Sequence, residues 1–372
     1  MKILITGGAG FIGSHTADRL LSLGYEVRVL DYLTTPVHPK GQKPNYLDSR
    51  IELIYGDVSD KECLYSAMLG CDIIIHLAAF QDYLPQFSKF VDVNVSSTAS
   101  IYEIILKHNL PIKKVIVASS QAAMGEGLYE DVKGRKILPD MRLEEDLKNG
   151  IFEPRPPKKF EGPLKWLPSD ENISNPQNPY GMSKISEEMF ALYLGKRYNI
   201  PTVALRYSIV QGSRQSFYNA YSGACRIFSL AFYQGNEPPI YEDGNQIRDF
   251  VNIHDVVDAN ILVIEDVRAN YETFNVGGGK AITVKNFAKV VADAYGRIDY
   301  EPVACGKYRF GDTRHIFSDI SKLKKLGWKP KRTVIDSVLE YKEWLDTADS
   351  IENIIEYCSQ KMKKLNVVRD VN

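Results

Sequence analysis

The chain opens with Lys2-Ile3-Leu4-Ile5-Thr6-Gly7-Gly8-Ala9-Gly10-Phe11-Ile12-Gly13, and this stretch decides the fold. The apolar run Lys2–Thr6 is long enough for one buried strand, and apolar residues at helical spacing follow the glycines. A strand, a glycine-rich turn and a helix form the start of a βαβ unit. Gly7 suits the tight turn, Gly10 lets the backbone approach a pyrophosphate, and Gly13 lets the helix lie close on the strand. The free N–H groups at the helix start would then face the phosphates.

The spacing Gly-x-x-Gly-x-x-Gly differs from the Gly-x-Gly-x-x-Gly of classical dehydrogenases, so its context decides its meaning. A strand precedes the glycines, a helix follows them, and Asp31 ends the next strand, residues 26–30. A carboxylate there can accept hydrogen bonds from the adenosine ribose, and it repels a 2′-phosphate. We therefore predict NAD rather than NADP as the cofactor; the alternative is a strand–helix turn without a ligand. The predicted contacts of this turn are Gly7, Gly10, Phe11, Ile12, Gly13 and Asp31.

Composition bounds the class of protein. The chain has 372 residues, 44% of them hydrophobic and 25% charged, with a net charge of −1, which is ordinary for a globular protein. Near-neutral charge gives no electrostatic case for nucleic acid or for an anionic membrane. Five scattered cysteines without a Cys-x-x-Cys pair favour a reducing, cytoplasmic setting and argue against a zinc site. The chain enters a strand at once and has no apolar run of about 20 residues, so we expect no signal peptide and no membrane helix.

The next segments continue the βα alternation. Strands are predicted at 51–54, 72–79 and 113–118, with a long helix at 87–108, so the fold class is α/β: a Rossmann-type, doubly wound parallel sheet. Residues at the carboxyl ends of these strands are placed to meet a ligand. The further cofactor contacts predicted in this way are Asp57, Val58, Leu77, Ala78, Ala79 and Asn94, which faces the sheet by its spacing. Asp57 could equally be a helix cap, and His76 is interpreted as a packed strand-end histidine.

The second half is less regular. Residues 124–178 are rich in proline and charge, which predicts either a functional insertion, assigned to 126–175, or a flexible surface excursion. Strands are expected at 201–207, 248–253 and 273–276, and helices at 178–198, 219–235, 254–266 and 283–295, with two more within 320–347 and a charged helix from 349. The glycine cluster 277–279 lacks a following acid and is interpreted as a turn. We predict a Rossmann domain over 1–210 and a substrate-binding lobe over 211–372, with segments free to cross between them.

Three residues carry the predicted chemistry. Tyr180 and Lys184 are four apart on one helix, so they face the same side. A tyrosine with its usual pKa of about 10 is a poor base at neutral pH, but a nearby ammonium and a positive nicotinamide ring favour the phenolate. Lys184 can also donate to the nicotinamide ribose, and Ser120, at the end of strand 113–118, can hydrogen-bond the same substrate oxygen as Tyr180. We predict Ser120, Tyr180 and Lys184 as the catalytic residues.

These motifs, in this order, resemble an extended short-chain dehydrogenase/reductase of the nucleotide-sugar epimerase/dehydratase family. The matching segments are Gly7–Gly13, Asp31, Asp57-Val58, His76–Ala79, Asn94, Ser119-Ser120, Tyr180–Lys184, Leu205–Tyr207, Arg248–Val251 and Leu326–Pro330. The resemblance implies a smaller C-terminal lobe that grips a nucleoside diphosphate sugar, and a homodimer formed through helices 87–108 and 178–198. It implies substrate contacts at Gln81, Gln121, Arg214, Arg248 and Arg314, the last two on the diphosphate. Arg314 could instead form a surface ion pair.

The residues after Ser120 narrow the reaction. Dehydratases of the family carry an Asp-Glu pair where this chain has Gln121 and Ala122, so elimination of water lacks its catalyst and hydride chemistry at one carbon remains. The stretches Gln81–Pro85 and Gly125–Tyr129 are similar to dTDP-L-rhamnose 4-epimerase-like and UDP-glucose 4-epimerase-like members. The insertion lacks the cysteine pairs of some relatives, so no metal is expected, and Ile209, Gln211 and Ser213 depart from the usual substrate-gripping residues. The expected activity is NAD-dependent 4-epimerisation; the alternatives are a 4-keto-sugar reductase or 2-epimerase, and a non-catalytic dinucleotide sensor.

Overall fold

The computed structural model describes residues 1–372 except 36, 83–84, 219–222, 348–355, 357–359 and 361. A seven-stranded sheet, in the order β12-β9-β5-β4-β1-β2-β3, forms its centre, and all neighbouring strands in it are parallel. The strands are β1 (Lys2–Thr6), β2 (Glu26–Asp31), β3 (Glu52–Tyr55), β4 (Ile73–His76), β5 (Lys114–Ser120), β9 (Thr202–Tyr207) and β12 (Glu272–Val276). The predicted doubly wound α/β sheet is confirmed, with strand bounds within a few residues of those expected.

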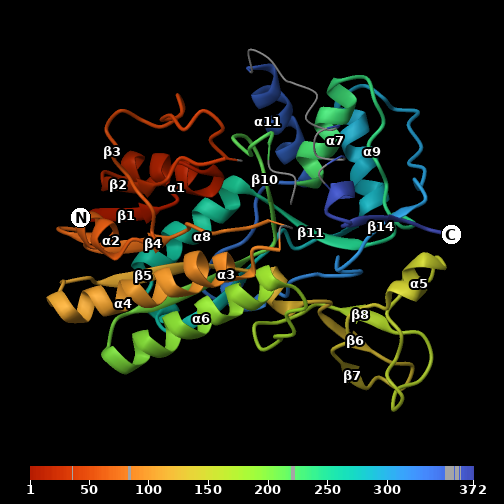
Figure 1. Cartoon of the computed structure of the whole chain (residues 1–372), viewed down its shortest axis with the longest axis horizontal. Coiled ribbons are helices and arrows are strands. Elements are labelled where there is room, and N and C mark those ends of the chain that lie inside the picture. The colour runs from red at the N-terminus through yellow and green to blue at the C-terminus, as the bar shows by residue number, and fades with distance from the viewer. Residues whose placement is uncertain (36, 83–84, 219–222, 348–355, 357–359, 361) are drawn as a thin grey trace.

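Helices cover both faces of the sheet because its strands alternate two sets of apolar side chains (Figure 1). In β1, Ile3 and Ile5 pack into one core, and Leu4 packs into the other. The first core is covered by α1 (Phe11–Ser22), α8 (Ile253–Glu265) and α10 (Ser321–Lys324), and the second by α2 (Lys61–Met68), α4 (Ser97–His108) and α6 (Pro179–Tyr198). The predicted helix 87–108 is confirmed in extent, but it consists of α3 (Phe87–Phe90), a π-helical segment η1 (Val91–Ser96) and α4.

A second lobe is built by the C-terminal half. A three-stranded sheet of β10 (Ile209–Gln211), β11 (Ile247–Asn252) and β13 (Ala281–Thr283) lies against α7 (Ala224–Tyr233), α9 (Val284–Ala294) and α11 (Val334–Asp346). Phe228, Phe250 and Phe287 pack together at the centre of this lobe. Between α8 and β13, the 3-10 turn η3 (Val267–Ala269) leads to β12, which returns to the central sheet. The boundary between the central sheet and the second lobe is therefore not a single point near residue 210, because β12 lies far beyond it and belongs to the central sheet.

Residues 121–178 form an insertion with its own structure. After the 3-10 turn η2 (Gln121–Met124), strands β6 (Leu128–Glu130), β7 (Lys136–Ile137) and β8 (Lys165–Leu167) make an antiparallel sheet, and α5 (Glu144–Lys148) lies beside it. Figure 1 shows this unit projecting below the second lobe. A second unpredicted pairing joins β14 (Lys307–Arg309) to β15 (Val368–Asp370), close to the C-terminus.

Three expectations fall partly on residues that the structure does not describe. They are the stretch Gln81–Pro85, the start of the helix expected at 219–235, and most of the helix expected from 349. Within the described part of the chain, no helix is both long and apolar enough to span a bilayer.

Candidate active site

A cavity of about 1290 Å³ runs along the carboxyl ends of the central strands and continues between the sheet and the second lobe. This is the edge at which open α/β sheets bind their ligands. The volume exceeds the roughly 300–1,000 Å³ of an ordinary small-molecule pocket, so it can take two ligands side by side. The glycine turn, the ends of β2 and β4, the end of β5, the start of α6 and the β14–β15 pair all contribute to its wall.

The glycine turn is built for close approach. Gly7 has a φ of +67° and its N–H donates to Leu30 O at 2.8 Å, which ties the turn to β2. A Cβ on Gly13 would lie 2.5 Å from Gly7 O, so only glycine lets α1 start this close to the strand. Helix α1 begins after Gly10 without a side-chain cap, so its first N–H groups are left for an anion. Gly7, Gly10, Phe11, Ile12 and Gly13 all line the cavity, as the sequence predicted.

Asp31 and Asp57 line the adjoining part of the cavity. Asp31 accepts from the N–H groups of Ala9 and Leu33, at 3.0 and 2.9 Å, so its carboxylate is held in place at the end of β2. The cap of α2 is Asp60, which accepts from Glu62 N and Cys63 N, whereas Asp57 accepts from Ser59 N and lines the cavity with Val58. The helix-cap alternative for Asp57 is therefore wrong. These acids and the bare helix start fit a dinucleotide with a free ribose 2′-hydroxyl.

The end of β4 lies beside this site. Leu77, Ala78 and Ala79 line the cavity, as predicted. Asn94 is fully buried and does not line it: Oδ1 accepts from Phe80 N at 2.7 Å, while Nδ2 donates to Phe80 O and to Ser183 Oγ. Asn94 thus ties the loop after β4 to α6, and the structure does not support a direct contact between it and the cofactor.

His76 is buried at the end of β4, where its ring nitrogens lie 2.7 Å from Thr6 Oγ1 and 3.0 Å from Ser97 Oγ. Burial, together with the nearby charge of Lys184, lowers the pKa of His76 to about 3. It is a neutral packed residue, as interpreted from the sequence.

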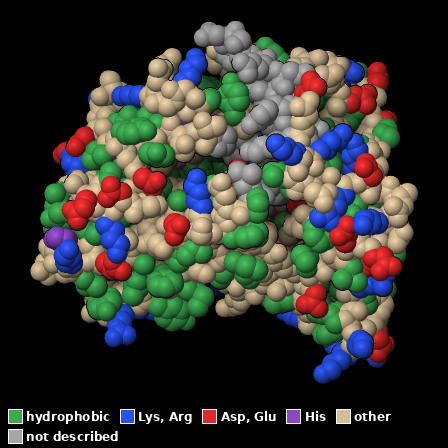
Figure 2. All heavy atoms as spheres, viewed as in Figure 1, with side chains coloured by type: hydrophobic (Ala, Val, Ile, Leu, Met, Phe, Trp, Pro, Cys, Tyr) green, Lys and Arg blue, Asp and Glu red, His purple; other side chains and the backbone are tan. Residues whose placement is uncertain are grey.

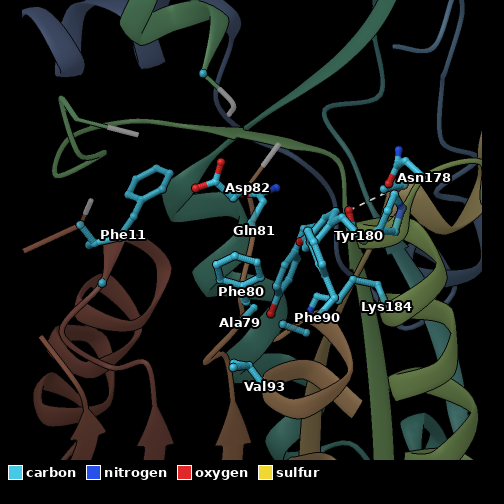
Figure 3. A pocket seen from close by; sticks show the side chains of 18 of the residues that line it. Phe11, Ala79, Phe80, Gln81, Asp82, Phe90, Val93, Asn178, Tyr180 and Lys184 are labelled. Carbon is cyan, nitrogen blue, oxygen red and sulfur yellow. Dashed lines mark hydrogen bonds between the residues drawn. The ribbon is translucent and has the colours of Figure 1, made fainter. Parts of the chain in front are cut away.

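The three predicted catalytic residues meet in the same cavity. Asn178 caps α6 by accepting from Gly181 N at 2.8 Å, and Pro179 occupies the first helical position, so the helix begins directly before Tyr180. Figure 3 shows Tyr180 and Lys184 on neighbouring turns of α6, directed into the cavity. Ser120 ends β5, and its side chain hydrogen-bonds Tyr180.

The electrostatics of Tyr180 differ in part from the prediction. Lys184 lowers the pKa of Tyr180, as expected, and so does the hydrogen bond from Ser120. Burial is the larger effect, and together with Glu187 it raises the pKa of Tyr180 above its ordinary value of 10.0. The phenolate therefore needs further positive charge close by, which an oxidised nicotinamide ring would provide.

Of the predicted substrate contacts, Gln81, Gln121 and Arg248 line the cavity. Arg248 lies with its guanidinium fixed by carbonyl oxygens: Nη1 donates to Ile247 O and Arg314 O, and Nη2 donates to Thr313 O at 2.9 Å. Gln121 Oε1 is buried without a hydrogen-bond partner among the described residues, so it is an acceptor placed at the cavity wall.

The structure does not bring Arg314 to the cavity. Its side chain is buried, with Nε and Nη2 bonded to Glu153 and Nη1 bonded to Glu242 and Asp243, all at 2.7 to 2.9 Å. The diphosphate contact expected for Arg314 is therefore corrected to an ion-pair network between the insertion and the turn at 242–243. The ion-pair alternative is right in kind, but the Arg314 side chain is buried, as is Glu242, whereas Glu153 and Asp243 are partly exposed.

Arg214 is likewise turned away from the cavity. Its Nη1 pairs with Asp18 at 2.7 Å, and its guanidinium lies over the ring of Tyr46 at 5.0 Å. Neither Arg214 nor Arg314 lines the cavity, so neither is placed to contact a ligand there.

Several lining residues escaped the sequence analysis. Arg309, Phe310, Asp312, Leu365, Asn366, Val367 and Arg369 line the cavity from the β14–β15 pair and the segments next to it. Met141 lines it from the insertion. Arg309 lies only five positions before Arg314, at the end of a short strand before a Gly-Asp turn. That turn was the one available signal, because the pairing of residues about 60 apart leaves no local pattern.

Comparison with known proteins agrees with this geometry. The model of the NAD dependent epimerase/dehydratase family matches residues 3–157 and 159–277. The chain belongs to this family. A dTDP-L-rhamnose 4-epimerase of Burkholderia thailandensis is 33% identical over 353 residues, 92% of this chain and 94% of that protein. A putative UDP-glucose 4-epimerase of Methanocaldococcus jannaschii is 32% identical, over 92% of this chain and 98% of that protein.

Solved structures extend the likeness to three dimensions. The UDP-glucose 4-epimerase of Thermotoga maritima with UDP-glucose superimposes with a TM-score of 0.75 at 29% identity, over 93% of this chain and 99% of the other. That of Thermus thermophilus in complex with NAD gives 0.72 at 25% identity, over 94% of this chain and 100% of the other. This chain is thus an NAD-dependent enzyme. Its glycine turn, Asp31 and Asp57 are the features that fit the cofactor.

Proposed function

We propose that the protein epimerises a nucleoside diphosphate sugar at C4 through a transient 4-keto intermediate. The observation that carries this proposal is the meeting of Ser120, Tyr180 and Lys184 in one cavity with the glycine turn. Bound NAD supplies a hydride acceptor that later returns the hydride to the sugar. The single cavity supports both half-reactions, because the same residues serve oxidation and reduction.

The residues of the chain move and hold one proton. The phenolate of Tyr180 takes the proton of the sugar 4-hydroxyl as the C4–H bond is broken, and Ser120 donates a hydrogen bond to the same oxygen. The ammonium of Lys184 stabilises the phenolate. In the reverse step Tyr180 returns the proton to the alkoxide at C4. Inversion requires the keto sugar to present its other face, and the width of the cavity supports such a turn.

The lining acids support epimerisation over elimination. Among the described residues, Asp31, Asp57, Asp82 and Asp312 are the carboxylates that line the cavity, and none belongs to β5 or to the turn directly after it. A dehydratase needs an acid and a base at that turn to remove water. Here the positions hold Gln121 and Ala122.

The test is NMR of dTDP-, UDP-, GDP- and CDP-sugars incubated with the protein without added NADH. We expect one sugar to be converted to a second of equal mass that differs at C4. Reduction of a 4-keto sugar with stoichiometric NADH loss, and no epimerisation of any sugar, would replace the proposal by the reductase alternative. Inversion at C2 would replace it by the 2-epimerase alternative.

Two arginines support a diphosphate-binding role for the far end of the cavity. Arg248 and Arg309 line it, and guanidinium groups pair with phosphate oxygens in a fixed fork geometry. Met141 from the insertion lines the cavity as well, which supports a role for the insertion in covering the substrate.

We also propose a homodimer formed by helix 87–108, which comprises α3, η1 and α4, and by α6. Helices α3, η1 and α6 expose large apolar side chains, and Figure 2 shows hydrophobic side chains gathered over the α4–α6 face. The exposed residues are Phe87, Val91, Met182, Met189, Phe190 and Tyr193. A patch of this kind marks an interface, and a second copy can offer the same face about a two-fold axis.

The scattered free cysteines support a cytoplasmic setting.

A further inference from the structure

Lys184 has a buried partner directly behind it. Glu187 follows Lys184 by three positions, so the two side chains lie on the same face of α6. Lys184 Nζ lies 2.6 Å from Glu187 Oε2, and the side chains are 2% and 0% exposed. An ammonium has three donors, so two remain for the cavity that Lys184 lines.

The neighbouring charges are already paired with one another. Glu188 accepts from Arg206 Nε and Nη2, both at 2.8 Å, and from Ser119 Oγ. The other titratable groups that face the Lys184–Glu187 pair are Tyr180 on the same helix, Tyr207 of β9 and His76 of β4. His76, Tyr180 and Tyr207 are neutral near neutral pH. Burial raises the pKa of Glu187 from 4.5 to about 7, so Glu187 is the counter-charge of Lys184 once the pH is above that value.

Stability of the fold does not by itself explain a buried carboxylate at position 187. Its second oxygen, Oε1, is buried and has no hydrogen-bond partner among the described residues. A buried acceptor without a partner is unfavourable, and apolar residues of similar volume commonly replace a buried ion pair without loss of stability. We therefore look for the role of the Glu187 carboxylate in its effect on the charge and position of Lys184, which is its hydrogen-bond partner.

We propose that Glu187 is a positioning residue that keeps the Lys184 ammonium charged and directed at the cofactor side of the cavity. A buried ammonium without a counter-charge loses its proton more readily, because burial disfavours the charged form. In this chain burial pulls the pKa of Lys184 down, but Glu187, helped by Tyr180, outweighs burial and raises it above 10.5. Lys184 then keeps its charge, and its hold on the cofactor, over the whole physiological range. The effect on turnover rests on the proposed function; the effect on cofactor binding does not.

The test is the pH dependence of NAD affinity, measured by calorimetric titration of the wild type and Glu187→Gln. The wild type should bind NAD equally well from about pH 8, where Glu187 is ionised, to about pH 9.5, below the lysine pKa. In Glu187→Gln, Lys184 loses its counter-charge, so NAD affinity should fall by about tenfold for each pH unit above the lowered lysine pKa, within this range. The same alkaline loss should enter the pH profile of kcat. Glu187→Met, which leaves no polar group unpaired, carries the same test if Glu187→Gln does not fold.

Two controls test whether the alkaline loss of NAD affinity comes from the Lys184–Glu187 pair. Glu188→Gln removes an equally buried carboxylate one position along, whose partner is Arg206, and should leave the pH dependence of NAD affinity unchanged. In a Lys184→Met background, Glu187→Gln should produce no alkaline loss, because the titrating group is gone. A pH dependence in Glu187→Gln that matches the wild type, or one that persists without Lys184, would overturn the proposal. A shifted NAD profile in a protein that epimerises no sugar would leave this inference standing and remove only the proposed function.

Discussion

Of two arginines five positions apart, one lines the cavity and the other does not. Arg309 lines the cavity from the end of β14, whereas Arg314 is enclosed by Glu153, Glu242 and Asp243. A sequence shows that an arginine is present but not whether carboxylates from distant segments already occupy it. Arg314 does not line the cavity for this reason, whereas Arg248, on β11, does; the diphosphate contact of Arg248 stays a prediction.

The two arginines should therefore respond differently to substitution. Arg309→Met should raise KM for the nucleotide sugar by at least about tenfold, because a charge-assisted contact of about 1.5–3 kcal/mol with the substrate is lost. Arg314→Met should lower the unfolding free energy by about 1.5–3 kcal/mol, because its charge-assisted hydrogen bonds to the buried Glu242 and to the partly exposed Glu153 and Asp243 are lost. Steady-state kinetics and denaturant titration separate the two. A stable Arg314→Met protein with raised KM would contradict this division.

We expect turnover to depend most on Tyr180. Tyr180→Phe should lower kcat by about 10²–10⁴-fold, the range typical for loss of an acid/base group. NAD binding should be nearly unchanged, because the glycine turn, Asp31 and Asp57 lie on other elements. Kinetics and NAD titration of the same preparation measure both. A variant that keeps wild-type turnover would assign the proton transfer to another group.

At the level of elements, those that depend on neighbouring residues were predicted from the sequence, whereas strands that pair with distant residues were not. The strand Lys2–Thr6, the helix from 178 and the helix from 283 each depend on a few neighbouring residues, and each was predicted. The β14–β15 pair and the small sheet of the insertion join short strands of two or three residues, whose periodicity is too brief to detect. The cavity wall that β14 and β15 form could therefore not be foreseen.

The insertion is held by a buried carboxylate that titrates in an unusual range. Glu126 lies 3.2 Å from Arg142 Nε and accepts from Arg314 N at 2.7 Å. Burial outweighs the charges of Arg142 and Arg248 and the hydrogen bond from Arg314 N, and it raises the pKa of Glu126 from 4.5 to about 7. The folded chain therefore binds more protons than the unfolded chain between these two values, and ionisation of Glu126 lowers stability as the pH rises through that window.

The direction of this pH dependence of stability can be measured by comparison with a variant that has no ionisable group at position 126. From about pH 4.5 to about pH 7, the unfolding free energy of the wild type should fall relative to that of Glu126→Gln, by up to about 1.4 kcal/mol per pH unit. Denaturant titrations of both proteins at several pH values give the difference. A difference that is constant with pH, or that changes in the opposite direction, would contradict the burial argument.

At the level of the whole molecule, the apolar face of α3, η1 and α6 predicts assembly. We expect a dimer at micromolar concentration by light scattering. Replacing Phe190 and Tyr193, which are 46% and 69% exposed, by glutamate should give a monomer, because like charges would meet across the two-fold axis. The matched control places glutamate at Val267 and Ile298, which are 74% and 77% exposed and lie on elements away from this face. A wild-type monomer would contradict the prediction, as would a dimer that survives the first pair of substitutions.

The central claim is that hydride leaves and returns to the same carbon within one active site. The direct measurement is to convert the accepted nucleotide sugar, labelled with deuterium at C4, and to locate the label in the product by NMR. The proposed mechanism predicts that deuterium remains at C4 while the configuration there is inverted, with no NADH released. Loss of deuterium to water, or inversion at another carbon with C4 unchanged, would contradict it.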